Sequence, residues 1–124
     1  MSSRILVVDD SATLRQEVSE VLTKVGFDVI EAEDGQIGAE MISKDSTISV
    51  VICDVNMPRL NGIDMVRNVK SQPQNANLSI LMLTTDGQPA LIKKAKEAGA
   101  KGWIVKPFKP AQLVAVVQKL AGVA

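Results

Sequence analysis

The residues best suited to chemistry in this sequence come directly after short apolar segments. They are three acids, one hydroxyl and one amine: Asp9, Asp10, Asp54, Thr84 and Lys106. The run from Val50 to Cys53 is typical of a strand buried on both faces, and it ends abruptly at Asp54. Parallel strands bring their carboxyl ends to one edge of a sheet, where open α/β sheets bind ligands. We therefore expect these five groups to lie close together.

Such a cluster predicts phosphoryl chemistry assisted by a metal ion. Carboxylates that share a site repel one another unless positive charge neutralises them, and Lys106 supplies only one such charge. Oxygen ligands without His or Cys suit Mg²⁺, which keeps open coordination positions for water and phosphate oxygens. The hydroxyl of Thr84 and the ammonium of Lys106 are suitable partners for a phosphoryl group. Asp54 is then the nucleophile that attacks phosphorus.

Each of these signals has a simpler explanation when it is taken alone. An acidic pair after a strand usually forms a turn or caps a helix, and a Lys-Pro dipeptide usually lies in a solvated loop. A Thr at the end of a strand usually has no chemical role. These explanations do not account for polar groups at four strand ends on one predicted edge, so we favour a chemical site.

Composition excludes several other classes of function. The 124 residues suit one domain, and 14 Lys and Arg balance 14 Asp and Glu, which leaves no electrostatic footprint for nucleic acid or an anionic membrane. The absence of histidine excludes Ser-His-Asp catalysis and histidine-ligated zinc. A single cysteine, Cys53, permits no disulfide within the chain, and no apolar stretch approaches the length of a membrane span. We therefore expect a cytoplasmic protein without membrane insertion.

The elements that must position the polar residues alternate along the chain. Strand-like apolar runs begin near Ile5, Phe27, Ile48, Ser79 and Gly102. Helical spacing of apolar residues follows each run, with typical helix-end signals at Gly26, Asp34, Gly62, Pro89, Gly99 and Pro110. The pattern predicts an α/β fold of five βα units, (βα)5, in which helices cover both faces of a doubly wound five-stranded parallel sheet. We expect one domain over residues 1–124, with no output domain.

Five segments, in order, resemble the receiver domains of two-component response regulators, specifically the single-domain, CheY-like chemotaxis type. They are LVVDDS, EAEDG, VICDVNMPRLNG, LMLTT and EAGAKGWIVKPF, and the resemblance runs from about Arg4 to Leu120. It implies a flavodoxin-like sheet with strand order 2-1-3-4-5. It also implies a stand-alone phospho-acceptor in a phosphorelay, which catalyses only its own phosphorylation and dephosphorylation and is not otherwise an enzyme.

The resemblance assigns roles to the residues at the first and third strand ends. Asp54 matches the aspartate that accepts the phosphoryl group and also contacts the metal. Asp9 and Asp10 match the acidic pair that holds Mg²⁺. Asn56 matches the residue whose backbone carbonyl completes the metal shell.

Further roles fall on the last two strands and the loops after them. Thr84 matches the switch hydroxyl, and Lys106 matches the lysine that contacts the phosphoryl group, with a peptide bond to the following proline that is typically cis in this family. Trp103 occupies the aromatic switch position, where the family more often has Tyr or Phe. Asn56 and Asp86 match positions beside the path of the water that dephosphorylates the domain.

The resemblance also implies partners. A sensor histidine kinase would donate the phosphoryl group from a phosphohistidine, and a phosphatase is a further expected partner. We expect a monomer that signals through its fourth helix, fifth strand and fifth helix, with the flagellar motor switch as the favoured target. That expected partner face comprises Gln88, Leu91, Ile92, Ala95, Trp103, Ala111 and Val114.

Three alternatives remain open at this level. The chain could drain phosphate from a shared kinase as a sink, or be a receiver-like binding module that turns over no phosphate. A haloacid-dehalogenase-type phosphatase also uses an aspartyl nucleophile with Mg²⁺, but it needs an acid two positions after the nucleophile. The residue at that position is Asn56, which disfavours this enzyme class.

Overall fold

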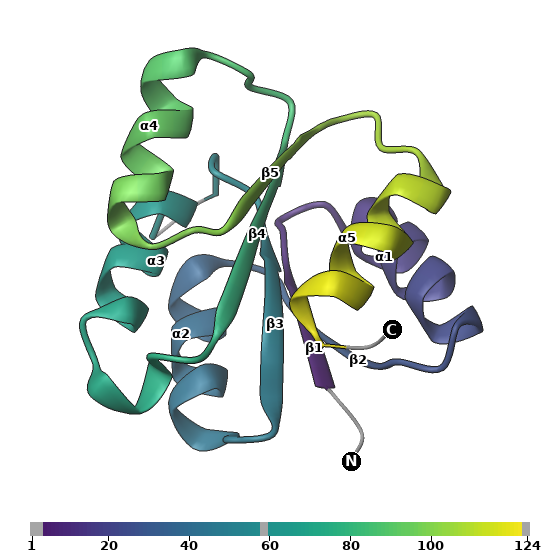
Figure 1. Cartoon of the computed structure of the whole chain (residues 1–124), viewed down its shortest axis with the longest axis horizontal. Helices are drawn as coiled ribbons and strands as arrows, with labels where there is room; N and C mark the ends of the chain where they lie inside the picture. The colour runs from purple at the N-terminus through teal and green to yellow at the C-terminus, as the bar shows by residue number, and fades with distance from the viewer. Residues whose placement is uncertain (1–3, 58–59, 123–124) are drawn as a thin grey trace.

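The computed structural model describes residues 4–57 and 60–122 (Figure 1). Its strands are β1 (Arg4–Val8), β2 (Asp28–Ala32), β3 (Ile48–Cys53), β4 (Ser79–Thr84) and β5 (Gly102–Val105). Its helices are α1 (Ala12–Lys24), α2 (Gly35–Lys44), α3 (Gly62–Lys70), α4 (Pro89–Ala98) and α5 (Pro110–Leu120), with a short 3₁₀ turn, η1 (Pro73–Asn75), that the sequence patterns did not predict. Pro58 and Arg59 of the VICDVNMPRLNG segment lie outside the described residues, as do the first three and last two positions of the expected domain.

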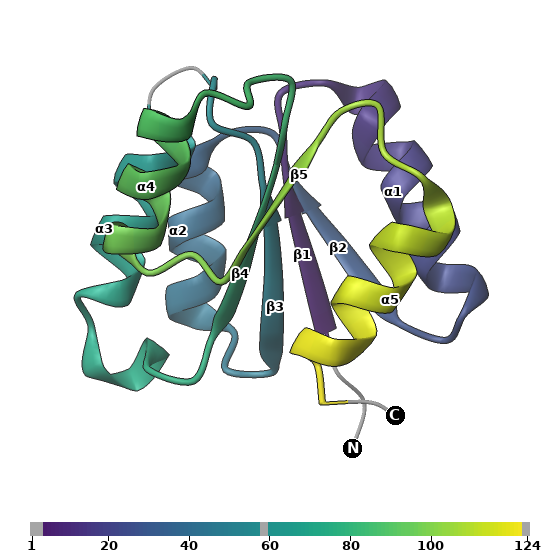
Figure 2. The same cartoon turned by 45° about the horizontal axis from the view of Figure 1, so that its top comes forward.

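The strands of the described chain form one parallel sheet in the order β2-β1-β3-β4-β5. Figure 2 shows this sheet lying between two layers of helices. Helix crossovers connect strands that run in the same direction, as parallel pairing requires. The predicted (βα)5 architecture and strand order are therefore confirmed.

The apolar side chains of each strand divide between two cores. On one face of the sheet, Ile5 and Val7 of β1 pack with α1 and α5; on the other, Leu6 and Val8 pack with α2, α3 and α4. Every residue of the inner strand β4 is buried, whereas the edge strand β2 has only Ala32 buried. The central strands β1, β3 and β4 are thus held rigidly, and so are the residues that follow them.

Helix ends form where the sequence signals predicted them. Asp34 caps α2 by accepting a hydrogen bond from the N–H of Ile37 at 2.9 Å. Gly99 ends α4 with a φ of +121°, a conformation that glycine adopts without steric cost. Asn61, which was not singled out from the sequence, caps α3 through the N–H of Asp64.

Gly62 lets the start of α3 approach the loop after β3 very closely. Its N–H donates to the carbonyl of Val55 at 2.8 Å. A Cβ atom at this position would lie 1.9 Å from the carbonyl oxygen of Asp54, which is backbone and cannot move aside easily. The packing of α3 therefore fixes the backbone that carries Asp54.

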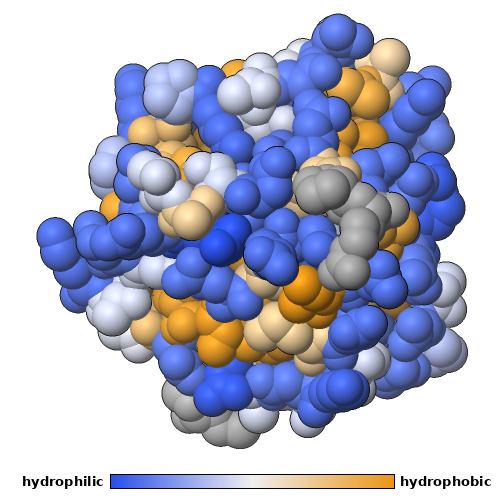
Figure 3. Space-filling view, turned by 180° about the vertical axis from the view of Figure 1, so that it is seen from behind, coloured by the Kyte–Doolittle hydropathy of each residue, from blue (hydrophilic) through white to orange (hydrophobic). Residues whose placement is uncertain are grey.

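The surface seen from behind in Figure 3 is mostly hydrophilic, with hydrophobic residues in separate patches. Some apolar surface is ordinary for a folded domain. None of the helices in the described part of the chain has the length and apolar character needed to cross a membrane.

Candidate functional site

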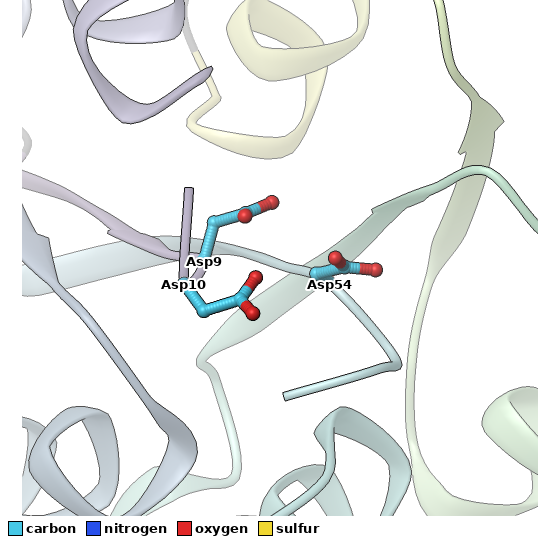
Figure 4. A group of neighbouring side chains, drawn as sticks. All are labelled: Asp9, Asp10 and Asp54. Carbon is cyan, nitrogen blue, oxygen red and sulfur yellow. The ribbon is translucent and has the colours of Figure 1, made fainter. Parts of the chain in front are cut away.

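Three carboxylates from two neighbouring strand ends lie close together at the carboxyl edge of the sheet. Figure 4 shows Asp9 and Asp10 after β1 and Asp54 after β3, and each offers an oxygen within 4.8 Å of the others. The backbone continues the sheet up to this point, because the N–H of Asp54 donates to the carbonyl of Val8 at 3.1 Å. The predicted gathering of these acids is what the structure shows.

Asp54 is held on both carboxylate oxygens. Its side chain is 10% exposed. Its Oδ1 accepts from the backbone N–H of Val55 at 2.7 Å and, more weakly, from that of Asn56 at 3.4 Å. Its Oδ2 lies 3.3 Å from the ammonium nitrogen of Lys106. The carboxylate is therefore oriented before any ligand arrives.

Lys106 bridges Asp54 and Asp9. Its nitrogen lies 2.9 Å from Oδ2 of Asp9, whose other oxygen accepts from the N–H of Ser11 at 2.9 Å. Burial raises the pKa of Asp9, and the bonds from Ser11 and Lys106 offset this only in part. Burial lowers the pKa of Lys106, but the hydrogen bond and charge of Asp9 and the charge of Asp54 outweigh it, so the pKa is raised overall. Lys106 is thus a cation held between two acids.

Asp10 differs from the other two acids because it is exposed. Within the described residues, its carboxylate has no hydrogen-bond or ion-pair partner. Three carboxylates within reach of one another, one of them free and solvent-facing, form an oxygen-only donor set that fits Mg²⁺. Asn56, also exposed, lies on the same loop, two positions after Asp54.

Thr84 ends β4 and is fully buried. The N–H of Lys106 donates to its carbonyl at 2.8 Å, which places the residue after β5 beside the end of β4. The hydroxyl oxygen of Thr84 lies 3.5 Å from the N–H of Asp86, a weak contact. The peptide bond between Lys106 and Pro107 is cis, as the family resemblance implied.

The indole of Trp103 is hydrogen-bonded to the loop that follows β4. Its Nε1–H donates to the backbone carbonyl of Asp86 at 3.1 Å. The carboxylate of Asp86 accepts from the N–H of Gln88 at 3.0 Å, so it is engaged at the start of α4. A chain of contacts therefore leads from the Thr84 hydroxyl through Asp86 to Trp103.

Two features of the site were not found by sequence reasoning. Arg15 of α1 donates to the backbone carbonyl of Asp9 at 2.6 Å, although its only signal in the sequence is a position one helical turn after Ser11. Cys53 is completely buried, as the apolar run before Asp54 predicted, but the hydrogen bond from its thiol to the Asp54 carbonyl had no signal in the sequence. Burial raises the pKa of this thiol strongly, so it stays protonated.

The expected partner face needs one correction. Ala95 is fully buried and packs in the core under α4, because it faces the sheet. Gln88 and Ala111 are exposed, and Leu91, Ile92, Trp103 and Val114 are partly exposed. Of the seven expected residues, the six other than Ala95 are therefore at least partly exposed.

The fold and the strand-end site together define an α/β protein of the flavodoxin-like class. The family described as "Response regulator receiver domain" matches residues 5–118, and the chain belongs to it. Within that family it is a CheY-like receiver. It is 38% identical over 120 residues to a chemotaxis protein CheY homolog of Campylobacter jejuni, covering 96% of this chain and 92% of that protein. It is equally identical to chemotaxis protein CheY1 of Helicobacter pylori, covering 96% and 97%.

Solved structures support the same assignment. Vibrio cholerae CheY4, a chemotaxis response regulator, superimposes with a TM-score of 0.90 at 39% identity, covering 97% of this chain and 99% of that one. A response regulator receiver domain protein from Clostridium thermocellum gives 0.88 at 27% identity, covering 97% and 94%. Receiver domains of this family are signalling phospho-acceptors that bind Mg²⁺ in an acidic pocket and interact with histidine kinases and downstream targets.

Proposed function

We propose that this chain is a stand-alone response regulator that accepts a phosphoryl group on Asp54 from the phosphohistidine of a sensor histidine kinase. The single observation that carries the proposal is the setting of Asp54. Its carboxylate is fixed by backbone N–H groups, contacts Lys106 and lies among two further acids. An aspartate held in this way is positioned to act as a nucleophile toward an electrophilic phosphorus.

In the proposed transfer, a carboxylate oxygen of Asp54 forms a bond to phosphorus while the bond from phosphorus to the donor nitrogen breaks. The N–H of Val55 orients the carboxylate for attack in line. Lys106, already a cation beside Oδ2, is placed to contact the incoming phosphoryl oxygens.

Asp9, Asp10 and Asp54, with the backbone carbonyl of Asn56, are the proposed Mg²⁺ ligands. When bound, Mg²⁺ would neutralise charge that develops on the transferred group. Asp10 has no hydrogen bond to break within the described residues, so it is available as a direct ligand. The carboxylate of Asp9 already accepts from Ser11 and Lys106, which suits a contact through water.

We propose that Thr84, Asp86 and Trp103 form the switch. Turning of the Thr84 hydroxyl toward a phosphorylated Asp54 would break its weak contact with the N–H of Asp86. The backbone carbonyl of Asp86 accepts a hydrogen bond from the indole of Trp103, so the loop and the indole would move together. Trp103 belongs to the surface of α4, β5 and α5, which would carry the signal to a protein partner.

The proposal extends to the lifetime and the destination of the signal. Asn56 and Asp86 would flank the attacking water during self-dephosphorylation. Asp86 would first have to release the N–H of Gln88. We propose the flagellar motor switch as the target, because the relatives named above are chemotaxis proteins. We also propose that the acting form is a monomeric, cytoplasmic receiver.

The test is phosphorylation in vitro. Acetyl phosphate with Mg²⁺ should add one phosphoryl group to the intact mass of the parent chain. The adduct should be absent from Asp54→Ala and from a reaction with excess chelator. Asp64→Ala is the matched control, because it removes an exposed acid from α3 and should leave labelling unchanged. An undiminished adduct in Asp54→Ala, or full labelling in chelator, would refute the proposal.

A further inference from the structure

Arg15 lies across the loop that carries the acidic pair. From α1, its Nη1 donates to the backbone carbonyl of Asp9 at 2.6 Å, a short, charge-assisted hydrogen bond. Its Nε donates to the Glu31 carboxylate of β2 at 3.1 Å, and the other oxygen of Glu31 accepts from the Ser19 hydroxyl at 3.3 Å. The Arg15 side chain is only 16% exposed. The Glu31 carboxylate thus fixes the guanidinium, and the guanidinium in turn fixes the carbonyl of Asp9.

The carbonyl that Arg15 holds belongs to the peptide unit joining Asp9 to Asp10. Because a peptide unit is planar, fixing its oxygen fixes the direction in which the chain continues to Asp10. Asp9 has further restraints, since its N–H donates to Ala32 and its carboxylate accepts from Ser11 and Lys106. The carboxylate of Asp10 has none among the described residues, so its position depends on the backbone before it.

We propose that Arg15 is a positioning residue for Mg²⁺ binding. Anchored by Glu31, it orients the Asp9–Asp10 peptide so that the carboxylate of Asp10 is presented beside Asp54. The inference rests on the proposed function, because it takes the three acids to be the Mg²⁺ site.

Charge alone predicts the opposite effect. A guanidinium close to a cation site repels the cation, so neutralising Arg15 should tighten Mg²⁺ binding if the side chain acts only through its charge. Positioning predicts weaker binding, since Asp10 would lose its orientation. The positive charge of Arg15 is tolerated near this site because its ion pair with Glu31 is neutral overall. The sign of the change therefore separates the two effects.

The test is a calorimetric titration of the metal-free chain with Mg²⁺ alone. Arg15→Ala should weaken Mg²⁺ affinity about 10-fold or more, the usual effect of losing a group that orients a metal ligand. Arg15→Lys keeps the charge and can reach one acceptor but not two, so it should recover part of the affinity. Arg67→Ala removes an equal charge from an exposed pair on α3 and should change nothing.

Unfolding in chelator is measured in parallel, because a merely structural role would lower the melting temperature without changing Mg²⁺ affinity. Equal or tighter Mg²⁺ binding by folded Arg15→Ala overturns the inference and leaves the proposed function standing. If Arg15→Ala does not fold, Arg15→Lys decides, and parent-like affinity in that variant overturns the inference. A parent chain that binds no Mg²⁺ overturns both the inference and the metal site it rests on.

Discussion

Replacing Lys106 by Met tests the electrostatic balance of the metal-free site. The ammonium lies 2.9 Å from Asp9 and 3.3 Å from Asp54, and the three side chains are 16%, 3% and 10% exposed, respectively. Met keeps most of the side-chain volume and removes the charge. Two largely buried carboxylates would then face each other without a counter-charge.

Removing one partner of a buried ion pair costs about 3–5 kcal/mol. Lys106 is partly exposed, so we expect the low end of that range, about 3 kcal/mol at neutral pH. That is a large share of the roughly 5–15 kcal/mol that stabilises a typical domain. With a urea m-value of about 2 kcal/mol/M, the unfolding midpoint should fall by about 1.5 M.

The pH dependence gives this prediction a second readout. The pKa of Asp9 is raised in the folded chain, so its protonated form contributes stability that is present below the unfolded value and is lost as pH rises through the folded pKa. Loss of the Lys106 bond should raise that pKa further. The destabilisation by Lys106→Met should therefore be smaller at about pH 5 than at about pH 7.5.

The assay is urea unfolding in chelator at both pH values, repeated with Mg²⁺. The proposed Mg²⁺ site exists only in the folded chain, and Mg²⁺ bound there would supply the positive charge that the variant lacks. Mg²⁺ should therefore reduce the difference in unfolding free energy between variant and parent. Lys96→Met, on the exposed side of α4, is the control for losing a lysine. A loss below about 1 kcal/mol in chelator, or a loss that grows toward low pH, would refute the reasoning.

Two further predictions concern backbone packing and the switch. Gly62→Ala should destabilise the chain by several kcal/mol in urea unfolding, because its Cβ would collide with the Asp54 carbonyl, whereas Gly26→Ala, in open space at a φ of +97°, should cost only about 1 kcal/mol. Equal losses would show that the close approach is not limiting. Thr84→Ala should still accept phosphate from acetyl phosphate with Mg²⁺, but the emission of Trp103, the only tryptophan, should no longer change. Losing one hydrogen bond to a charged oxygen, worth about 1.5–3 kcal/mol, is enough to uncouple the indole. An undiminished emission change would show that the hydroxyl is not part of the proposed switch.

Periodicity and strand-end chemistry were enough to predict the sheet, its covering helices and the meeting of the acids with Lys106. These signals are local, since an apolar run followed by Asp54 carries both the strand and its polar end. The clamp of Arg15 on Asp9 could not be predicted, because it depends on the rotamer of a long side chain and on Glu31 from a separate strand. The burial of Ala95 was missed for a similar reason: the helical pattern places it on a face but does not say what covers that face.

The contact between Asp9 and Lys106 joins residues that are 97 positions apart in the chain. It closes only when β5 has paired with β4, and contacts between residues so distant in sequence are costly in entropy to form. β5 has four residues and lies at the edge of the sheet, so it is well placed to detach by local unfolding. A molecule with β5 detached would keep its acids in place but lose the lysine between them. If the proposed phosphoryl transfer needs Lys106, only molecules with the complete sheet would accept a phosphoryl group, and a nearly folded or still-growing chain would not.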